Sequence, residues 1–208
     1  DSILSFLSDF CETLPSSIQH LEVWGDNAST VKSNFLYGWA QEMCLQRFVS
    51  VTLRFMVPGH TKFAPDRLLS AISAKFRVAN VFNGRQLAAV CQAAQAPGEM
   101  RVVEFSHSDI RLWREALAVR YPRPVPGVRE HRYVSARRTP AGIELGTHAT
   151  NVNAERDVVY NGGIPLDSTA LVPDAQAAPH GVPKKERDLA DTYHKYVDMA
   201  EWPTFLRR

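Results

Sequence analysis

The segments LEVWGDN at residues 21–27 and VSVTLRFMV at residues 49–57 decide the fold of this chain. In the second segment apolar and polar residues alternate, which is typical of a strand with one buried face. The first segment is typical of a short, buried strand that ends at Asp26. Between the two, apolar side chains recur at every fourth position from Val31 to Met43, which predicts a helix packed on a sheet. This order of elements predicts an α/β fold.

Periodicity elsewhere predicts further elements of the same kind. Helices are expected over residues 2–14 (with Ile3, Phe6, Leu7 and Phe10 inward), from Pro65 to Phe76, over 86–94, from Ile110 to Leu117, and from Pro183 onward. A short strand is expected over 101–105, and a hairpin over 130–136 and 142–147. Residues 149–182 show little periodicity, which predicts a long irregular segment. We therefore expect a single domain with three regions: a core portion with the hairpin (1–148), the irregular segment (149–182), and a C-terminal helix and tail (183–208).

The composition is ordinary for a globular protein, with 45% hydrophobic and 22% charged residues. The longest apolar runs have the length of strands, so no membrane span is expected. The amphipathic N-terminus lacks the basic region of a signal peptide, and a chain that begins without Met is expected to be a processed or partial product. The three widely spaced cysteines predict buried free thiols in an intracellular, reducing compartment, either the nucleus or an organelle.

The net charge of +2 indicates little about partners, but the distribution of charge is more informative. Six arginines lie between Arg120 and Arg138, against one acid, Glu130. A basic face of this kind suits contact with the phosphates of DNA or RNA, although a solvated hairpin face is an equally good interpretation. The candidate nucleic-acid-binding residues are Arg129, Arg132, Arg137 and Arg138, with Lys62 in the Pro-Gly-His-Thr-Lys turn.

Two aspartates at junctions before helices are the candidates for chemistry. Asp26 ends the first strand, Asp66 begins a helix, and His60 lies in the turn between them. Two such carboxylates could share Mg²⁺ or Mn²⁺ ions, which activate a water or hydroxyl for phosphodiester chemistry, while His60 orients a phosphate or moves a proton. The common alternative is structural, because an acid in a first helical turn is favoured by the helix dipole and Asp-Asn pairs favour turns.

Gly25-Asp26-Asn27 before a helix, followed by VPGHTKFAPD at residues 57–66, resembles the transposon-encoded proteins of eukaryotes with an RNase H-like, integrase-type core. This resemblance implies a partial RNase H-like fold with a mixed sheet flanked by helices. It implies that Asp26 is the middle acid of an Asp-Asp-Asp/Glu set that binds Mg²⁺ or Mn²⁺, with Asp66 as the third acid. It also implies that His60 and Lys62 lie beside this site.

The chain departs from that family in two places. Residues 28–33 replace the polar motif that follows the middle acid, of which only the closing Asn34 remains. The family carries its first acid on its first strand, whereas the twenty-five residues before Asp26 are predicted to form a helix. A site that lacks one metal ligand is expected to lose most of its activity.

Three hypotheses follow from these features. The favoured one is a catalytically inactive, transposase-derived domain that acts as a structural or nucleic-acid-binding subunit of an assembly with other protein chains. The second is an active, metal-dependent transposase or nuclease whose first acid lies on a missing N-terminal part or on a partner chain. The third is an unrelated α/β binding module.

Overall fold

A computed structural model of the chain describes residues 1–26, 31–56, 64–95, 101–148, 158–165 and 168–175. The chain divides into two compact units: Asp1–Thr61 with His107–Gln176 (unit 1), and Lys62–Ser106 with Ala177–Arg208 (unit 2). The expectation of a single domain with three regions stays a prediction.

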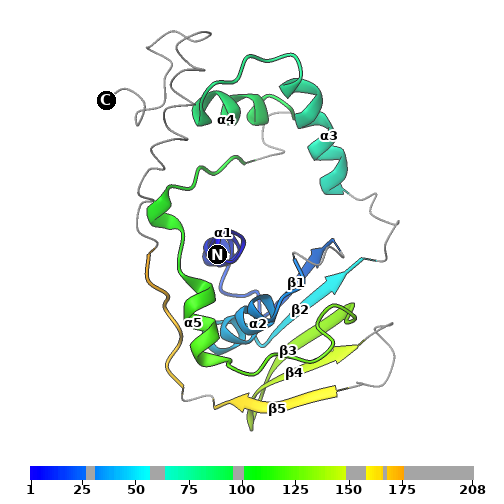
Figure 1. Ribbon diagram of the computed structural model, residues 1–208, viewed down its shortest axis with the longest axis vertical. Helices are drawn as coiled ribbons and strands as arrows, with labels where there is room; N and C mark the ends of the chain where they lie inside the picture. The colour runs from blue at the N-terminus through cyan, green and yellow to red at the C-terminus, as the bar shows by residue number, and fades with distance from the viewer. Residues whose placement is uncertain (27–30, 57–63, 96–100, 149–157, 166–167, 176–208) are drawn as a thin grey trace, which may run out of the picture. The chain divides into compact units, whose positions relative to one another are not determined.

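Unit 1 is an α/β layer structure built on one mixed sheet (Figure 1). Its elements are α1 (Ser2–Thr13), β1 (His20–Gly25), α2 (Asn34–Gln46), β2 (Ser50–Phe55), a 3-10 turn η1 (His107–Asp109), α5 (Trp113–Arg120), β3 (Tyr133–Thr139), β4 (Gly142–His148) and β5 (Val158–Ile164). The five strands lie in the order β1-β2-β3-β4-β5, with β1 and β2 parallel and the other neighbours antiparallel. The prediction of an α/β fold with a mixed sheet is therefore confirmed.

The core of unit 1 forms where α2 packs on β2, β3 and β4. Ser33 caps this helix, since its hydroxyl accepts a hydrogen bond from the Leu36 backbone N–H at 3.3 Å. Along α2, Tyr37 and Trp39 are fully buried, because α1 and α5 pack on the side of the helix that the sheet leaves free. Alternate residues of the strands complete the core: Val51, Leu53, Phe55, Val134, Ala136, Ile143 and Leu145.

The helices cover one face of the sheet and leave the other face without a helix among the described residues of unit 1 (Figure 1). Strand β1 therefore alternates between half-buried and exposed residues. The sequence predicted a buried strand instead. Trp24 is 54% exposed on the open face. The register places Trp24 opposite Arg54, and Arg54 opposite Tyr133, so these three residues form a row across β1, β2 and β3.

Other predictions for unit 1 differ from the structure in detail. In α1, Phe6 and Phe10 are each 48% exposed, whereas Leu4 and Cys11 are buried. Strand β5 lies within the segment that was expected to be irregular, and it pairs with β4 across a register shift between Ile143 and Leu145.

Unit 2 contains helices α3 (Ala64–Phe76) and α4 (Gly84–Gln92), which contact each other. Asn83 caps α4 by accepting a hydrogen bond from the Gln86 backbone N–H at 2.9 Å. Residues 101–105, predicted as a strand, have no regular secondary structure and pair with no strand that the structure describes. The predicted C-terminal helix and tail lie outside the described residues. Among the helices that are described, none is long and apolar enough to cross a membrane.

Candidate functional site

The carboxyl ends of the two parallel strands meet at one edge of the sheet. The Met56 backbone N–H donates to the Gly25 carbonyl oxygen at 3.2 Å, directly beyond the last paired residues. The exposed Asp26 follows Gly25, and the Pro-Gly-His-Thr-Lys segment follows Met56. The described ends of the two strands, at Asp26 and Met56, therefore lie at the same edge of the sheet, which we call the carboxyl edge. This is where open α/β sheets bind their ligands.

The predicted metal ligands lie in different units. Asp26 belongs to unit 1, and Asp66 lies in the first turn of α3 in unit 2, where its carbonyl oxygen accepts a hydrogen bond from the Ser70 hydroxyl at 2.8 Å. His60 and Lys62 lie outside the described residues. The sharing of a metal ion by the two aspartates stays a prediction. Within the part of the chain that the structure describes, no group of three or more His, Cys, Asp or Glu side chains is placed to hold a metal ion.

The Lys32 ammonium and the backbones of Arg129 and Arg132 lie beside the carboxyl edge in unit 1, and we call these three basic residues the basic cluster. The Lys32 ammonium is 5.1 Å from the centre of the Phe55 ring and donates to the Arg129 carbonyl oxygen at 3.0 Å. The Arg132 carbonyl oxygen accepts from the Phe55 backbone N–H at 2.8 Å. The same Phe55 ring lies against Gly25, at 3.7 Å from where a side chain would begin. Lys32 therefore packs on the same ring that lies against Gly25, the residue directly before Asp26.

The electrostatics of the basic cluster depend on Lys32, whose side chain is only 4% exposed. Burial lowers the pKa of the Lys32 ammonium, and the charge of Arg132 lowers it further. No salt bridge to Lys32 or Arg132 occurs among the described residues. Because neither cation is held in a salt bridge by a described residue, both keep the capacity to bind an anion at this edge.

The remaining predicted arginines lie on β3 and face in different directions. Arg138 donates from Nε to the Cys44 carbonyl oxygen at 3.2 Å and from Nη2 to the Leu45 carbonyl oxygen at 3.2 Å, so it satisfies the C-terminal carbonyls of α2. Arg137 is exposed on the open face, donates to the Ser135 hydroxyl at 3.1 Å, and lies opposite Glu144 in the register. Of the two, only Arg137 presents its guanidinium on the open face of the sheet.

The open face adds an aromatic feature next to the basic cluster. The Arg54 guanidinium lies 5.1 Å from the centre of the Trp24 ring and 5.3 Å from that of the Tyr133 ring. Its charge is balanced by Glu22, since the two side chains form a salt bridge at 2.6 Å. Rigid aromatic rings held beside a cation offer a surface on which flat, unsaturated rings can stack.

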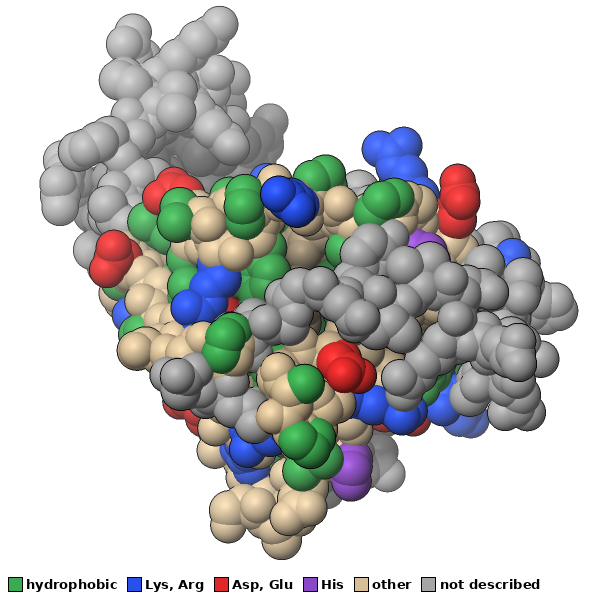
Figure 2. All heavy atoms as spheres, turned by 90° about the horizontal axis from the view of Figure 1, so that it is seen from below, with side chains coloured by type: hydrophobic (Ala, Val, Ile, Leu, Met, Phe, Trp, Pro, Cys, Tyr) green, Lys and Arg blue, Asp and Glu red, His purple; other side chains and the backbone are tan. Residues whose placement is uncertain are grey.

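Sequence reasoning missed both Lys32 and Trp24 as candidate residues. A single lysine before a helix gives no periodic signal. For Trp24 a signal was present, because Glu22 shares its face in an alternating strand and an acid at that position indicates a face open to water. On the face drawn in Figure 2, the basic side chains are scattered among acidic and hydrophobic ones, so the described side chains form no continuous basic patch in that view.

Comparison of the chain with family models, with curated proteins and with solved structures finds no match.

Proposed function

We propose that this chain is an RNase H-like domain of transposon origin that no longer catalyses and instead binds nucleic acid as a subunit of a larger assembly. One observation carries this proposal: Lys32 and the backbones of Arg129 and Arg132, three basic residues, lie beside the edge where Asp26 leaves β1. A pair of divalent ions needs several carboxylates around it, whereas an excess of positive charge suits the phosphate backbone of DNA or RNA.

The aromatic row on the open face supports a single-stranded ligand. Trp24 is more than half exposed although it lies in a strand, and Arg54 holds its ring from one side. Single-stranded nucleic acids bind where a positively charged groove follows the phosphates and aromatic side chains stack with the bases. In this arrangement the basic cluster contacts phosphates, and Trp24 stacks with a base.

Fluorescence polarisation with labelled single-stranded DNA, duplex DNA and single-stranded RNA at increasing salt tests this proposal. We expect Arg132→Gln and Arg129→Gln to weaken binding to all three, and each to reduce the slope of log K against log salt by about 1. We expect Trp24→Ala to weaken the single-stranded ligands by about tenfold and to leave the duplex unaffected. Arg85→Gln, at an exposed position on α4 in unit 2, is the matched control and should change neither slope nor affinity. Absence of binding at low salt would contradict the proposal.

Cleavage is assayed with the same oligonucleotides in Mg²⁺ or Mn²⁺. The proposal predicts intact oligonucleotides with the wild-type chain and with Asp26→Asn. Cleavage by the wild-type chain that Asp26→Asn abolishes would instead establish the enzyme.

The second candidate, an active metal-dependent transposase or nuclease, is favoured by one further observation. Strand β1 forms an edge of the sheet, and no described strand pairs with its outer side. An additional strand that carries an acid, contributed by a partner chain or another segment, could add to this edge and place its carboxylate next to Asp26.

A further inference from the structure

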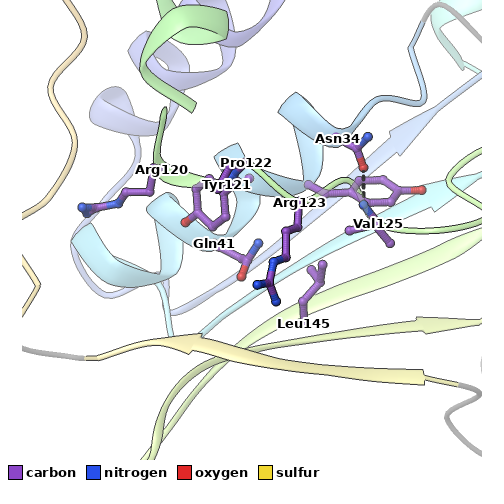
Figure 3. Close-up of a pocket in the computed structure, with 10 residues that line it drawn as sticks. Asn34, Gln41, Arg120, Tyr121, Pro122, Arg123, Val125 and Leu145 are labelled. Carbon is purple, nitrogen blue, oxygen red and sulfur yellow. Dashed lines mark hydrogen bonds between the residues drawn. The ribbon is translucent and has the colours of Figure 1, made fainter. Parts of the chain in front are cut away.

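A cavity of about 320 Å³ lies in unit 1 between α2 and the proline-rich connector that follows α5. Its walls are largely apolar and include the rings of Tyr37 and Tyr121 and the side chains of Val125 and Leu145. The connector is fixed at this place, because the Asn34 amide oxygen accepts a hydrogen bond from the Val125 backbone N–H at 2.8 Å (Figure 3). This volume lies within the range of cavities that bind small molecules.

Two polar side chains project into the cavity from opposite walls, Gln41 from α2 and Arg123 from the connector (Figure 3). Gln41 is only 8% exposed, and its side-chain amide has no hydrogen-bond partner among the residues that the structure describes. The amide atoms are not enclosed by protein but reach the open space of the cavity, where water or a ligand can satisfy them. Gln41 thus supplies unused hydrogen-bond donors and an acceptor at the wall of the cavity.

The charge at the cavity comes from Arg123. The neighbouring Arg120 is neutralised, since its Nε lies 2.7 Å from the fully buried Glu42 carboxylate. For Arg123 no acidic partner exists within the described part of the chain. The planar guanidinium therefore keeps its donors for a carboxylate or similar anion, which it can bind through two parallel hydrogen bonds.

We propose that this cavity binds a small organic anion with a flat apolar body, an aromatic carboxylate. Its carboxylate pairs with Arg123 and accepts from the Gln41 amide, while its body contacts Tyr121 and Val125. This site uses none of the residues of the basic cluster and does not depend on nucleic-acid binding.

Isothermal titration of the full chain with 2-naphthoate tests the proposal. Two further probes separate its parts: 2-naphthamide has the same shape without the charge, and inorganic phosphate has charge without the apolar body. We expect 2-naphthoate to bind at least tenfold more tightly than either probe. Tighter or equal binding of phosphate, or equal binding of the amide, would overturn the assignment of the ligand class. Absence of 2-naphthoate binding at 1 mM would overturn the site.

Variants then locate the binding. Arg123→Gln, at an exposed position, should weaken the binding of 2-naphthoate by about tenfold, because a charge-assisted hydrogen bond is lost. Gln41→Leu keeps the volume of the side chain but removes the amide, and we expect a smaller loss of about fivefold. Arg85→Gln is the matched control in unit 2. Binding that Arg123→Gln leaves unchanged, or that Arg85→Gln weakens equally, would contradict the proposal.

Discussion

The buried ion pair between Glu42 and Arg120 permits a sharp test of the packing in unit 1. Glu42 is completely buried in α2 and accepts hydrogen bonds from Arg120 at 2.7 Å, the Tyr121 hydroxyl at 3.0 Å and the Leu171 backbone N–H at 3.1 Å. Burial, and then the Glu42 charge, raise the pKa of Tyr121, so its hydroxyl remains a donor throughout the neutral range. One carboxylate thus fastens α5 and the 168–175 segment to the central helix.

Arg120→Met leaves this carboxylate buried without its cation, and such a change costs about 3–5 kcal/mol. We expect about 3 kcal/mol, the lower end, because the Arg120 side chain is 22% exposed and water can partly replace it. Glu42→Leu should also cost about 3 kcal/mol, since it leaves three partly buried donors without this acceptor, at about 1 kcal/mol each. The double variant has no buried charge, so it should cost less than the sum, with a coupling energy of about 2–3 kcal/mol.

Urea unfolding of the full chain at pH 7 measures these free energies. The fluorescence of the buried Trp39 and Trp113 reports the unfolding of unit 1, and the m value must stay constant across the variants for the comparison to hold. Arg129→Met is the control, because its exposed side chain should contribute less than about 0.5 kcal/mol. A cost below about 1 kcal/mol for Arg120→Met, or additive single variants, would refute the buried ion pair.

Two further predictions use the same packing. Gly38→Ala should destabilise the chain by about 1 kcal/mol in urea unfolding, because a Cβ at this position would lie 3.0 Å from the Tyr121 ring. The higher helix propensity of Ala offsets only part of this overpacking. In the control Gly84→Ala the new Cβ meets nothing within 4 Å, so the free energy of unfolding should change by less than about 0.5 kcal/mol. Burial raises the pKa of Cys44 to about 12, so this group stays mainly a thiol below that pH, and its alkylation by iodoacetamide should remain slow throughout pH 7 to pH 9. Peptide mapping by mass spectrometry should find the half-buried Cys91 modified first, and equal rates at pH 8 would contradict the burial of Cys44.

The elements that the sequence predicted well are those with a strong local pattern. The alternation over 49–57 predicted β2, because a strand with one buried face must alternate. In α1 two apolar stripes compete, one through Phe6 and Phe10 and one through Leu4 and Cys11, and periodicity alone does not show which stripe packs on α2. Residues 101–105 have the composition of a strand without a partner among the described strands. Strand pairing is non-local, so composition alone could not decide these cases.

Strand β5 is the opposite case, a strand that the structure contains and the sequence did not predict. Only its first residues, Val158 to Tyr160, have strand propensity, and the sequence then continues Asn161-Gly162-Gly163. Pairing with β4 stabilises this segment, with a register shift between Ile143 and Leu145 where the alternation is lost. Because strand pairing is non-local, the periodicity of this segment alone does not predict the strand.

For the candidate site, the sequence predicted the position of Asp26 but not the charge around it. A buried lysine is rare, and nothing in the sequence around Lys32 distinguishes it from a solvated one. Its burial follows from Phe55 and the Arg129 carbonyl, which the fold brings together from segments far apart in the sequence.

The charge at the carboxyl edge also distinguishes the two leading hypotheses on physical grounds. The pKa of Lys32 is lowered by burial and by Arg132, which means that the surroundings disfavour positive charge at this place. A divalent cation bound beside the same edge would add to that repulsion, and each carboxylate brought to hold it would first have to compensate the lysine. A phosphate does the reverse, because it supplies the counter-charge that Lys32 and Arg132 lack among the described residues.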